Sequence, residues 1–127
     1  SLTAGERHSY HTIDIALDPI PYNGGTTTCE ALWMGVPVIA LQGCCFCSRM
    51  SYSLMHTLGL KELSAATETE YVEIAISLAS DLSRLHNIRQ TLRTRMMASP
   101  LCDGRLAAQE LEQAYRRTWQ KFCAEGR

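Results

Sequence analysis

Residues 23–30 combine side chains that could bind a phosphorylated ligand. Gly24 and Gly25 precede three threonines, and Glu30 follows four residues after Thr26. If a helix begins at the threonines, its first amide groups are unpaired and, with the helix dipole, attract an anion. The glycines let a phosphate approach the backbone closely, and the hydroxyls add donors. The pattern predicts a phosphate site.

Glu30 extends this prediction from a phosphate to a nucleotide. It projects from the same helix side as Thr26, about 5–6 Å further along, where a carboxylate can reach the vicinal hydroxyls of a ribose. Two alternatives stay open from spacing alone. Thr27 and Glu30 also fit a capping box, and glycines precede the helix in many βαβ units. The Gly-Lys-Ser/Thr of a Walker loop is absent.

The elements around this stretch predict a βαβ unit over about residues 10–43. Apolar runs at residues 13–17 and 36–41 are typical of buried strands, and residues 26–34 between them favour a helix that Gly35 ends. The two strands are then parallel, with the threonines at their carboxyl edge, where open sheets bind ligands. Residues 22–25 predict a turn, because two glycines after Asn23 permit backbone conformations with positive φ.

A helical remainder follows over about residues 47–124. We expect helices from residue 48 to 58 and after the capping box Thr67–Glu70, a short edge strand at 60–63, and a last helix capped by Asp103. Two or three strands with about five helices amount to half of a doubly wound sheet, so the chain is expected to be a fragment whose missing strands precede residue 1. The expected apolar helix faces are Tyr71, Ile74, Ala75 and Leu78; Leu85, Ile88, Leu92 and Met96; and Leu111, Tyr115, Thr118 and Phe122.

Composition narrows the function classes. The chain has 127 residues, 46% hydrophobic, and a net charge of −1, with no apolar run near the roughly 20 residues of a membrane span and no signal peptide. The basic residues of the last third are expected to solvate helices, because no aromatic residues interleave with them to bind nucleic acid. The six cysteines lack paired zinc spacings, so we expect no metal and mostly buried, reduced thiols in the cytoplasm.

The ordered motifs Asp14-Ile-Ala-Leu-Asp18 and Pro21-Tyr-Asn-Gly-Gly-Thr-Thr-Thr-Cys-Glu-Ala-Leu-Trp-Met-Gly-Val-Pro37 resemble the protein O-linked N-acetylglucosamine transferase family (glycosyltransferase family 41), including its bacterial and SPINDLY-like members. The similarity continues through Ser99-Pro100-Leu101-Cys102-Asp103 to Trp119. The resemblance implies an α/β fold. Residues 1–127 would form a partial Rossmann-like parallel sheet with flanking helices, the later part of the second half of a GT-B glycosyltransferase.

The resemblance also assigns roles by position. Gly25, Thr26 and Thr27 match the turn that binds the donor diphosphate, and Glu30 matches the residue that holds the ribose. Asn23 and Gly24 match the residues that shape the loop. The animal enzyme has a histidine where Gly25 stands. His8 is a candidate for the base pocket, although relatives place that histidine where Glu6 stands here.

The function implied is transfer of N-acetylglucosamine from its uridine diphosphate to serine or threonine of proteins. No catalytic residue is expected in this piece, no cofactor is implied, and Arg49 is either a cleft residue or an ordinary surface arginine. An upstream catalytic half and tetratricopeptide repeats are the expected partners within the parent protein. The alternatives are a SPINDLY-type O-fucosyltransferase that uses GDP-fucose, an inactive nucleotide-binding fragment, and a phosphate-binding protein unrelated to sugars.

Overall fold

A small parallel sheet organises the chain, of which the computed structural model describes residues 9–126. Three strands lie in the order β1-β2-β3, and both neighbouring pairs are parallel. Ala16 lies opposite Val38, and Ala40 lies opposite Ser64. The predicted α/β class with a parallel sheet is therefore confirmed. The strands are β1 (Ala16–Leu17), β2 (Val38–Leu41) and β3 (Ser64–Ala65).

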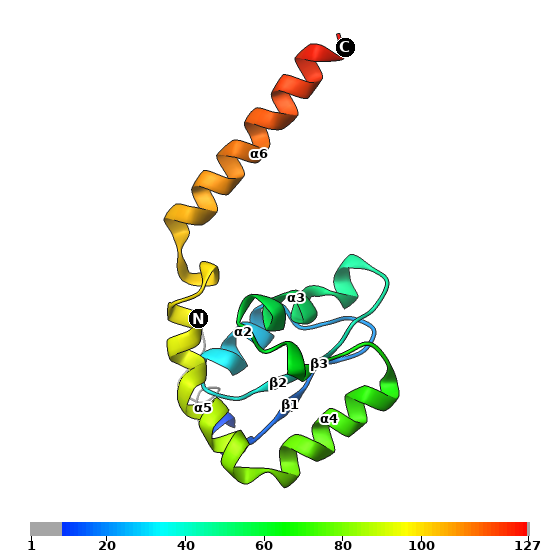
Figure 1. Ribbon diagram of the computed structural model, residues 1–127, viewed down its shortest axis with the longest axis vertical. Coiled ribbons are helices and arrows are strands. Elements are labelled where there is room, and N and C mark those ends of the chain that lie inside the picture. The colour runs from blue at the N-terminus through cyan, green and yellow to red at the C-terminus, as the bar shows by residue number, and fades with distance from the viewer. Residues whose placement is uncertain (1–8, 127) are drawn as a thin grey trace.

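Helices cover the sheet on both faces, as buried parallel strands require. In Figure 1, α3 and α4 lie on opposite sides of β2, which both contact, and α5 runs along the side of the sheet against α2 and α4. The helices are η1 (Tyr10–Thr12), α2 (Thr26–Trp33), η2 (Phe46–Ser48), α3 (Met50–Thr57), η3 (Lys61–Leu63), α4 (Glu68–Ser80), α5 (Leu82–Met97), η4 (Pro100–Cys102) and α6 (Gly104–Ala124).

The core forms where the predicted apolar faces meet β2. Ile39 and Ala40 of β2 are fully buried, as is Leu92 of α5. The expected face of α5 is buried throughout, and that of α4 packs against the same core cluster. Local signals also hold at helix starts: the Thr67 hydroxyl accepts the Glu70 amide at 3.2 Å. The Glu70 carboxylate in turn accepts the amide of Ala66 at 2.7 Å.

Two strand predictions were wrong in their limits. Residues 61–63 form the turn η3 rather than part of an edge strand, and β3 follows it. One 3₁₀ turn places Leu60 and Leu63 on the same side, and both are completely buried. β1 is shorter than the apolar run because, in the register of Ala16 opposite Val38, the next ladder bond would need an N–H from Pro37, which has none. The Arg89 guanidinium donates instead to the carbonyls of Ile13 and Asp14, at 2.7 and 2.9 Å.

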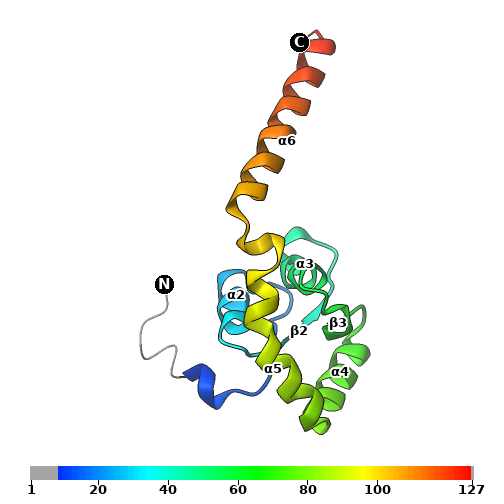
Figure 2. The same ribbon diagram turned by 60° about the vertical axis from the view of Figure 1, so that its left-hand side comes forward.

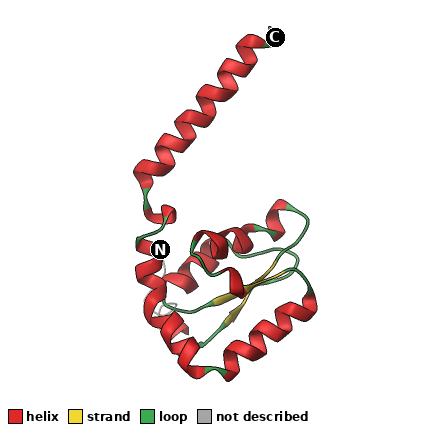
Figure 3. Cartoon of the chain, in the orientation of Figure 1, coloured by secondary structure: helices red, strands yellow, loops and turns green. Residues whose placement is uncertain are grey.

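The last helix, α6, extends away from the sheet and touches η4 at its start (Figures 1, 2 and 3). It forms as predicted, but none of its residues is buried. Leu111 and Tyr115 are exposed, and Trp119 stacks on Phe122 with ring centroids 5.7 Å apart. Among residues 9–126, no helix has both the length and the apolar character that crossing a bilayer demands.

The cysteines differ from expectation. All six are free thiols, but Cys44, Cys45, Cys102 and Cys123 are exposed and only two are half-buried. The prediction of mostly buried thiols was wrong because these four lie on a loop, on η4 and on the unpacked helix α6. Within the described part, no three His, Cys, Asp or Glu side chains gather in a way that could hold a metal ion.

Candidate functional site

The start of α2 presents an uncapped helix end at the carboxyl edge of the sheet. Gly25 is the N-cap residue, and no side chain caps the helix. The capping-box interpretation of Thr27 and Glu30 was therefore wrong. Thr26 and Thr27 are exposed, and Glu30 is half-buried one turn further along. The first turn of α2 is thus uncapped by any side chain and carries two exposed threonines, as an anion site requires.

Gly24 is needed for space rather than for backbone conformation. Among residues 9–126, positive φ occurs at Gly35, Gly59 and Gly126, so the predicted turn forms without the positive φ that its glycines permit. A Cβ built on Gly24 would lie 2.5 Å from the Thr28 hydroxyl and 2.7 Å from that of Thr27. Both distances are too short for a carbon atom, so the turn is packed against the helix it precedes.

A buried carboxylate fastens this turn to the sheet. Asp18 follows β1 directly and is 3% exposed. Its Oδ1 accepts the amide of Gly24 at 3.0 Å and the hydroxyl of Thr28 at 3.3 Å. Ser51 of α3 lies 3.1 Å from the same hydroxyl and donates to the Gly24 carbonyl at 3.0 Å. Strand, turn, α2 and α3 are therefore joined through one hydrogen-bonded group.

Burial raises the pKa of Asp18 above its ordinary value, opposed by hydrogen bonds from Gly24, Ser51 and Thr28. Its second oxygen, Oδ2, is buried without a hydrogen-bond partner, which is costly for a charged carboxylate. Tyr71 of α4 donates its hydroxyl to the Asp18 carbonyl at 3.0 Å. Burial, and secondarily the Asp18 charge, raises the pKa of Tyr71.

Asn23 connects the turn to the loop after β2. It is 3% exposed, and its amide donates to the Cys47 carbonyl at 2.9 Å. Its side chain donates to the Pro19 carbonyl at 3.3 Å. Both bonds run within or between loops at the carboxyl edge. The structure thus places Asn23 and Gly24 inside the turn and Gly25, Thr26 and Thr27 at its tip.

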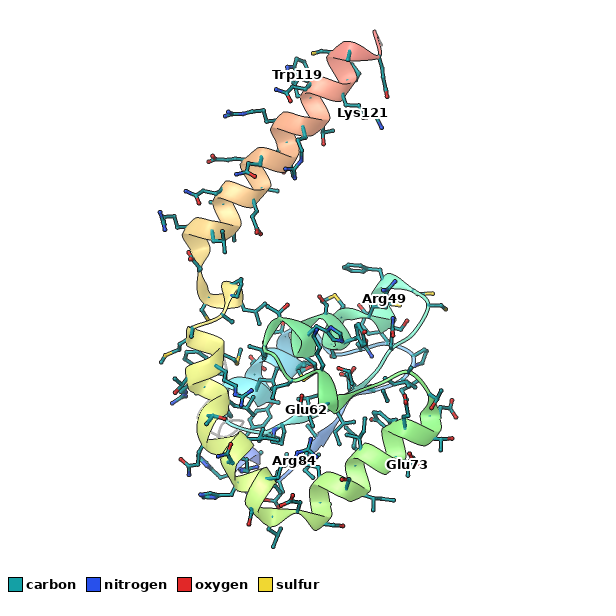
Figure 4. All side chains as sticks on the ribbon, in the orientation of Figure 1. Arg49, Glu62, Glu73, Arg84, Trp119 and Lys121 are labelled. Carbon is teal, nitrogen blue, oxygen red and sulfur yellow. The ribbon has the colours of Figure 1, made fainter. Side chains whose placement is uncertain are left out.

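The remaining candidates lie elsewhere. Glu6 and His8 fall outside the described residues. Arg49 is exposed at the start of α3 (Figure 4), just before Met50, whose methyl lies 3.1 Å from a Cβ built on Gly25. A hollow of about 660 Å³ on α3 includes Arg49 but none of the α2 residues. The α2 tip is the better candidate for the donor site, because it combines the free start of a helix and the hydroxyls of Thr26 and Thr27 with the carboxylate of Glu30 one turn further along.

Comparison with known proteins then decides the family. The profile described as glycosyl transferase family 41 matches residues 4–111. The chain belongs to glycosyl transferase family 41. This confirms the resemblance noted in the sequence.

Individual relatives agree with this assignment. A Petunia hybrida protein named "Probable UDP-N-acetylglucosamine–peptide N-acetylglucosaminyltransferase SPINDLY" is 49% identical over 91% of this chain and 12% of its own length. A Caenorhabditis elegans UDP-N-acetylglucosamine–peptide N-acetylglucosaminyltransferase is 32% identical over 86% of this chain and 10% of its own. The solved structure of a mutant O-GlcNAc transferase from Thermobaculum terrenum superposes with a TM-score of 0.86, at 39% identity, over 100% of this chain and 24% of that one.

The family 41 chain thus spans about an eighth of the length of the curated relatives it matches. The superposition confirms the predicted fold class, because the neighbour is a GT-B glycosyltransferase and this chain matches about a quarter of its length. The diphosphate, ribose and loop-shape roles of the α2 residues stay predictions.

The anchoring group was missed by sequence reasoning. The sequence predicts no role for Asp18, and it predicts that Thr28 adds a donor hydroxyl together with Thr26 and Thr27, although Thr28 is 4% exposed. One signal was available: a carboxylate directly after a buried parallel strand lies at the edge where such sheets bind ligands. The partners Ser51 and Tyr71 had no such signal in the sequence.

Substitution of Asp18 tests the anchor. Because the native pKa is raised, the ionised form destabilises the fold. The free energy of unfolding should therefore fall, relative to Asp18→Asn, as pH rises above 3.8 through the native pKa. Asp18→Ala, which strands the Gly24 amide and the Thr28 hydroxyl, should cost about 1–3 kcal/mol. Urea unfolding of the three proteins across that pH range measures both effects. A pH-independent difference between wild type and Asp18→Asn would contradict the assignment.

Proposed function

We propose that the chain is the nucleotide-sugar-binding part of a protein O-glycosyltransferase that moves N-acetylglucosamine from UDP-N-acetylglucosamine to serine or threonine. The observation that carries this proposal is the uncapped start of α2, with the hydroxyls of Thr26 and Thr27 exposed beside it. The names of the relatives in plants and in the nematode support the same activity.

The proposed chemistry uses the α2 tip to stabilise the leaving group. As the sugar departs, negative charge grows on the nucleotide diphosphate, and amides and hydroxyls already aimed at it stabilise the transition state without reorganising. Gly25, Thr26 and Thr27 hold the diphosphate, and Glu30 accepts hydrogen bonds from the ribose hydroxyls. The first turn of α2 contains no acidic residue that would repel the phosphates.

The remaining parts of the reaction are assigned to the parent protein. We propose that the acceptor site and the catalytic groups lie in an upstream catalytic half preceded by tetratricopeptide repeats. Two features support a missing neighbour: β1 is an edge strand of a three-stranded sheet, and α6 exposes its apolar side chains. Both are costly to leave in water, and a further domain would cover them.

A fucosyltransferase that uses GDP-fucose is the second candidate. The chain is 44–49% identical to the plant SPINDLY proteins and 32% identical to the nematode enzyme, so it is more similar to the SPINDLY group. Calorimetric titration with UDP and GDP separates the two candidates by which nucleotide binds more tightly. Absence of binding to either nucleotide by a folded sample would contradict both.

Glu30→Ala tests the ribose contact. Hydrogen bonds to a charged group are worth about 1.5–3 kcal/mol, so the Kd for the preferred nucleoside diphosphate should rise about ten- to hundredfold. Glu73→Ala is the control, because Glu73 is an exposed glutamate on α4 (Figure 4). The wild type should also bind the 2′,3′-dideoxy analogue more weakly than the parent nucleotide, and Glu30→Ala should bind both equally. A variant that still discriminates between them would refute the assigned contact.

A further inference from the structure

Three thiols crowd the loop between β2 and α3, at the same edge of the sheet as the α2 tip. Cys44 and Cys45 are exposed, and their Sγ atoms lie 3.6 Å apart. Cys47, two residues on, is half-buried. The site described above uses none of these sulfur atoms. Adjacent exposed thiols at this distance can form a disulfide bond when an oxidant is supplied.

The loop holds this arrangement through its own backbone. The Ser48 hydroxyl accepts the Cys45 amide at 3.1 Å and donates to the Cys45 carbonyl at 3.0 Å. The Gly43 amide donates to the Ser48 carbonyl at 2.8 Å and closes the loop. A Cβ on Gly43 would collide with the Ser48 side chain, so the loop is tightly packed at this point. Cys45 is therefore fixed beside Cys44.

The same loop is bonded to the proposed donor turn. The Cys47 carbonyl accepts the Asn23 amide at 2.9 Å. Asn23 directly precedes Gly24, whose amide is held by Asp18. A change in the backbone between Cys45 and Cys47 therefore reaches the turn through one hydrogen bond.

We propose that Cys44 and Cys45 are a reversible oxidation site that reacts with small-molecule disulfides of the glutathione type, and that closing the bond weakens the donor turn. The second half of this statement rests on the proposed function, whereas the first does not. A disulfide here is strained, since consecutive Cα atoms lie about 3.8 Å apart and disulfides usually span about 4.4–6.8 Å. Strained, exposed disulfides are the easily reduced ones, which suits a reversible modification.

The exchange proceeds in two steps. Cys44, as the thiolate, attacks one sulfur of the small disulfide, forms a mixed disulfide and releases one small thiolate. Cys45 then gives its proton to that thiolate, attacks the Cys44 sulfur and releases the second small thiolate, which takes up the proton lost from Cys44. Two protein thiols and one small disulfide thus become one protein disulfide and two small thiols. The hydrogen bond to Cys44 raises the pKa of Cys45, consistent with Cys45 as the proton-holding, second-reacting thiol.

Mass spectrometry of peptides tests the modification. After incubation of the folded protein with glutathione disulfide, the peptide with Cys44 and Cys45 should be two hydrogen masses lighter and carry no glutathione, whereas the exposed Cys102 and Cys123 form only mixed disulfides. Dithiothreitol should reverse the loss of mass. Cys44→Ser and Cys45→Ser should each abolish the bond and retain a mixed disulfide, whereas Cys47→Ser and the distant control Cys123→Ser should still form it. A bond that uses Cys47, or no intramolecular bond, overturns the proposal.

Nucleotide titration of the reduced and oxidised forms tests the coupling. Oxidation should raise the Kd about three- to tenfold, as expected for loss of one backbone hydrogen bond. Cys45→Ser, treated in the same way, forms only a mixed disulfide at Cys44, and its Kd should change less than that of the wild type. Repeating the treatment with cystamine, a smaller disulfide, shows how much of that change comes from the bulk of the attached group. If the bond forms and the Kd is unchanged, the coupling is refuted. If the reduced protein binds no nucleotide, the proposed function fails while the oxidation site is still judged by mass spectrometry.

Discussion

Gly24→Ala should weaken nucleoside diphosphate binding by about ten- to a hundredfold. The new methyl group falls 2.5 Å from the Thr28 hydroxyl and 2.7 Å from the Thr27 hydroxyl, so one or both must move. Displacing Thr28 breaks its bond to Asp18, and displacing Thr27 removes a proposed phosphate donor. The overpacking lowers the free energy of unfolding by about 1–3 kcal/mol, whereas loss of a hydrogen bond to the charged diphosphate weakens binding by about 1.5–3 kcal/mol. Calorimetry measures the change in Kd.

Gly104→Ala provides the matched control. A Cβ on Gly104, the first residue of α6, meets no atom within 4 Å, and the residue has no part in the proposed site. Its effect on the Kd should therefore be clearly smaller than that of Gly24→Ala. Circular dichroism should show that both variants keep their helices. Equal affinities for the two variants would mean that the packing of Gly24 does not shape the binding turn.

Leu92→Ala should lower the free energy of unfolding by about 2–5 kcal/mol, a large share of the about 5–15 kcal/mol that holds a typical domain. Leu92 is 0% exposed and belongs to the core cluster that joins α5 to β2 and α2. Its truncation removes apolar contacts and leaves a cavity that close-packed neighbours fill only partly. Chemical denaturation, with the midpoint and slope compared to wild type, measures the loss.

Leu82→Ala on the same helix is the control. Leu82 is 72% exposed, so its truncation removes little buried surface and should change stability by less than about 0.5 kcal/mol. The same side-chain atoms are removed on the same helix, so the difference between the two variants reports the burial of Leu92. A similar cost for both would show that α5 is not packed on the sheet as the structure has it.

Local sequence signals predicted the elements well where they depend on neighbouring residues. The helix ends at Gly35 and Gly59 follow from positive φ at those residues, +83° and +68°. The Asp103 cap forms through the Leu106 amide at 2.9 Å. Strand limits were less accurate, since β1 begins only where its register partner on β2 passes Pro37, which has no N–H for the ladder. Which residues of two strands lie opposite one another depends on the packing of the fold and has no trace in the apolar pattern.

The proposed donor turn was likewise predicted only in part. Its residue types alone predicted an anion site at a helix start, with Glu30 one turn along, because helix geometry relates residues four apart. The capping-box alternative could be rejected only in three dimensions, where Gly25 proves to be the cap residue. The packing of Gly24 against the Thr28 hydroxyl, which leaves no room for a Cβ, was likewise visible only in the structure.

The sequence by itself determined the family, the parallel α/β class and the helix start at the threonines, since periodicity, caps and ordered motifs are properties of short stretches. The tertiary structure decided which side chains of that turn are exposed and which hold the scaffold together. Thr28 turns inward to Asp18 and Ser51, 10 and 23 residues away, and Tyr71 reaches Asp18 across 53 residues. It also brought the loop containing Cys44 and Cys45 against Asn23. Such contacts depend on how the strands and helices pack, and no local pattern encodes them.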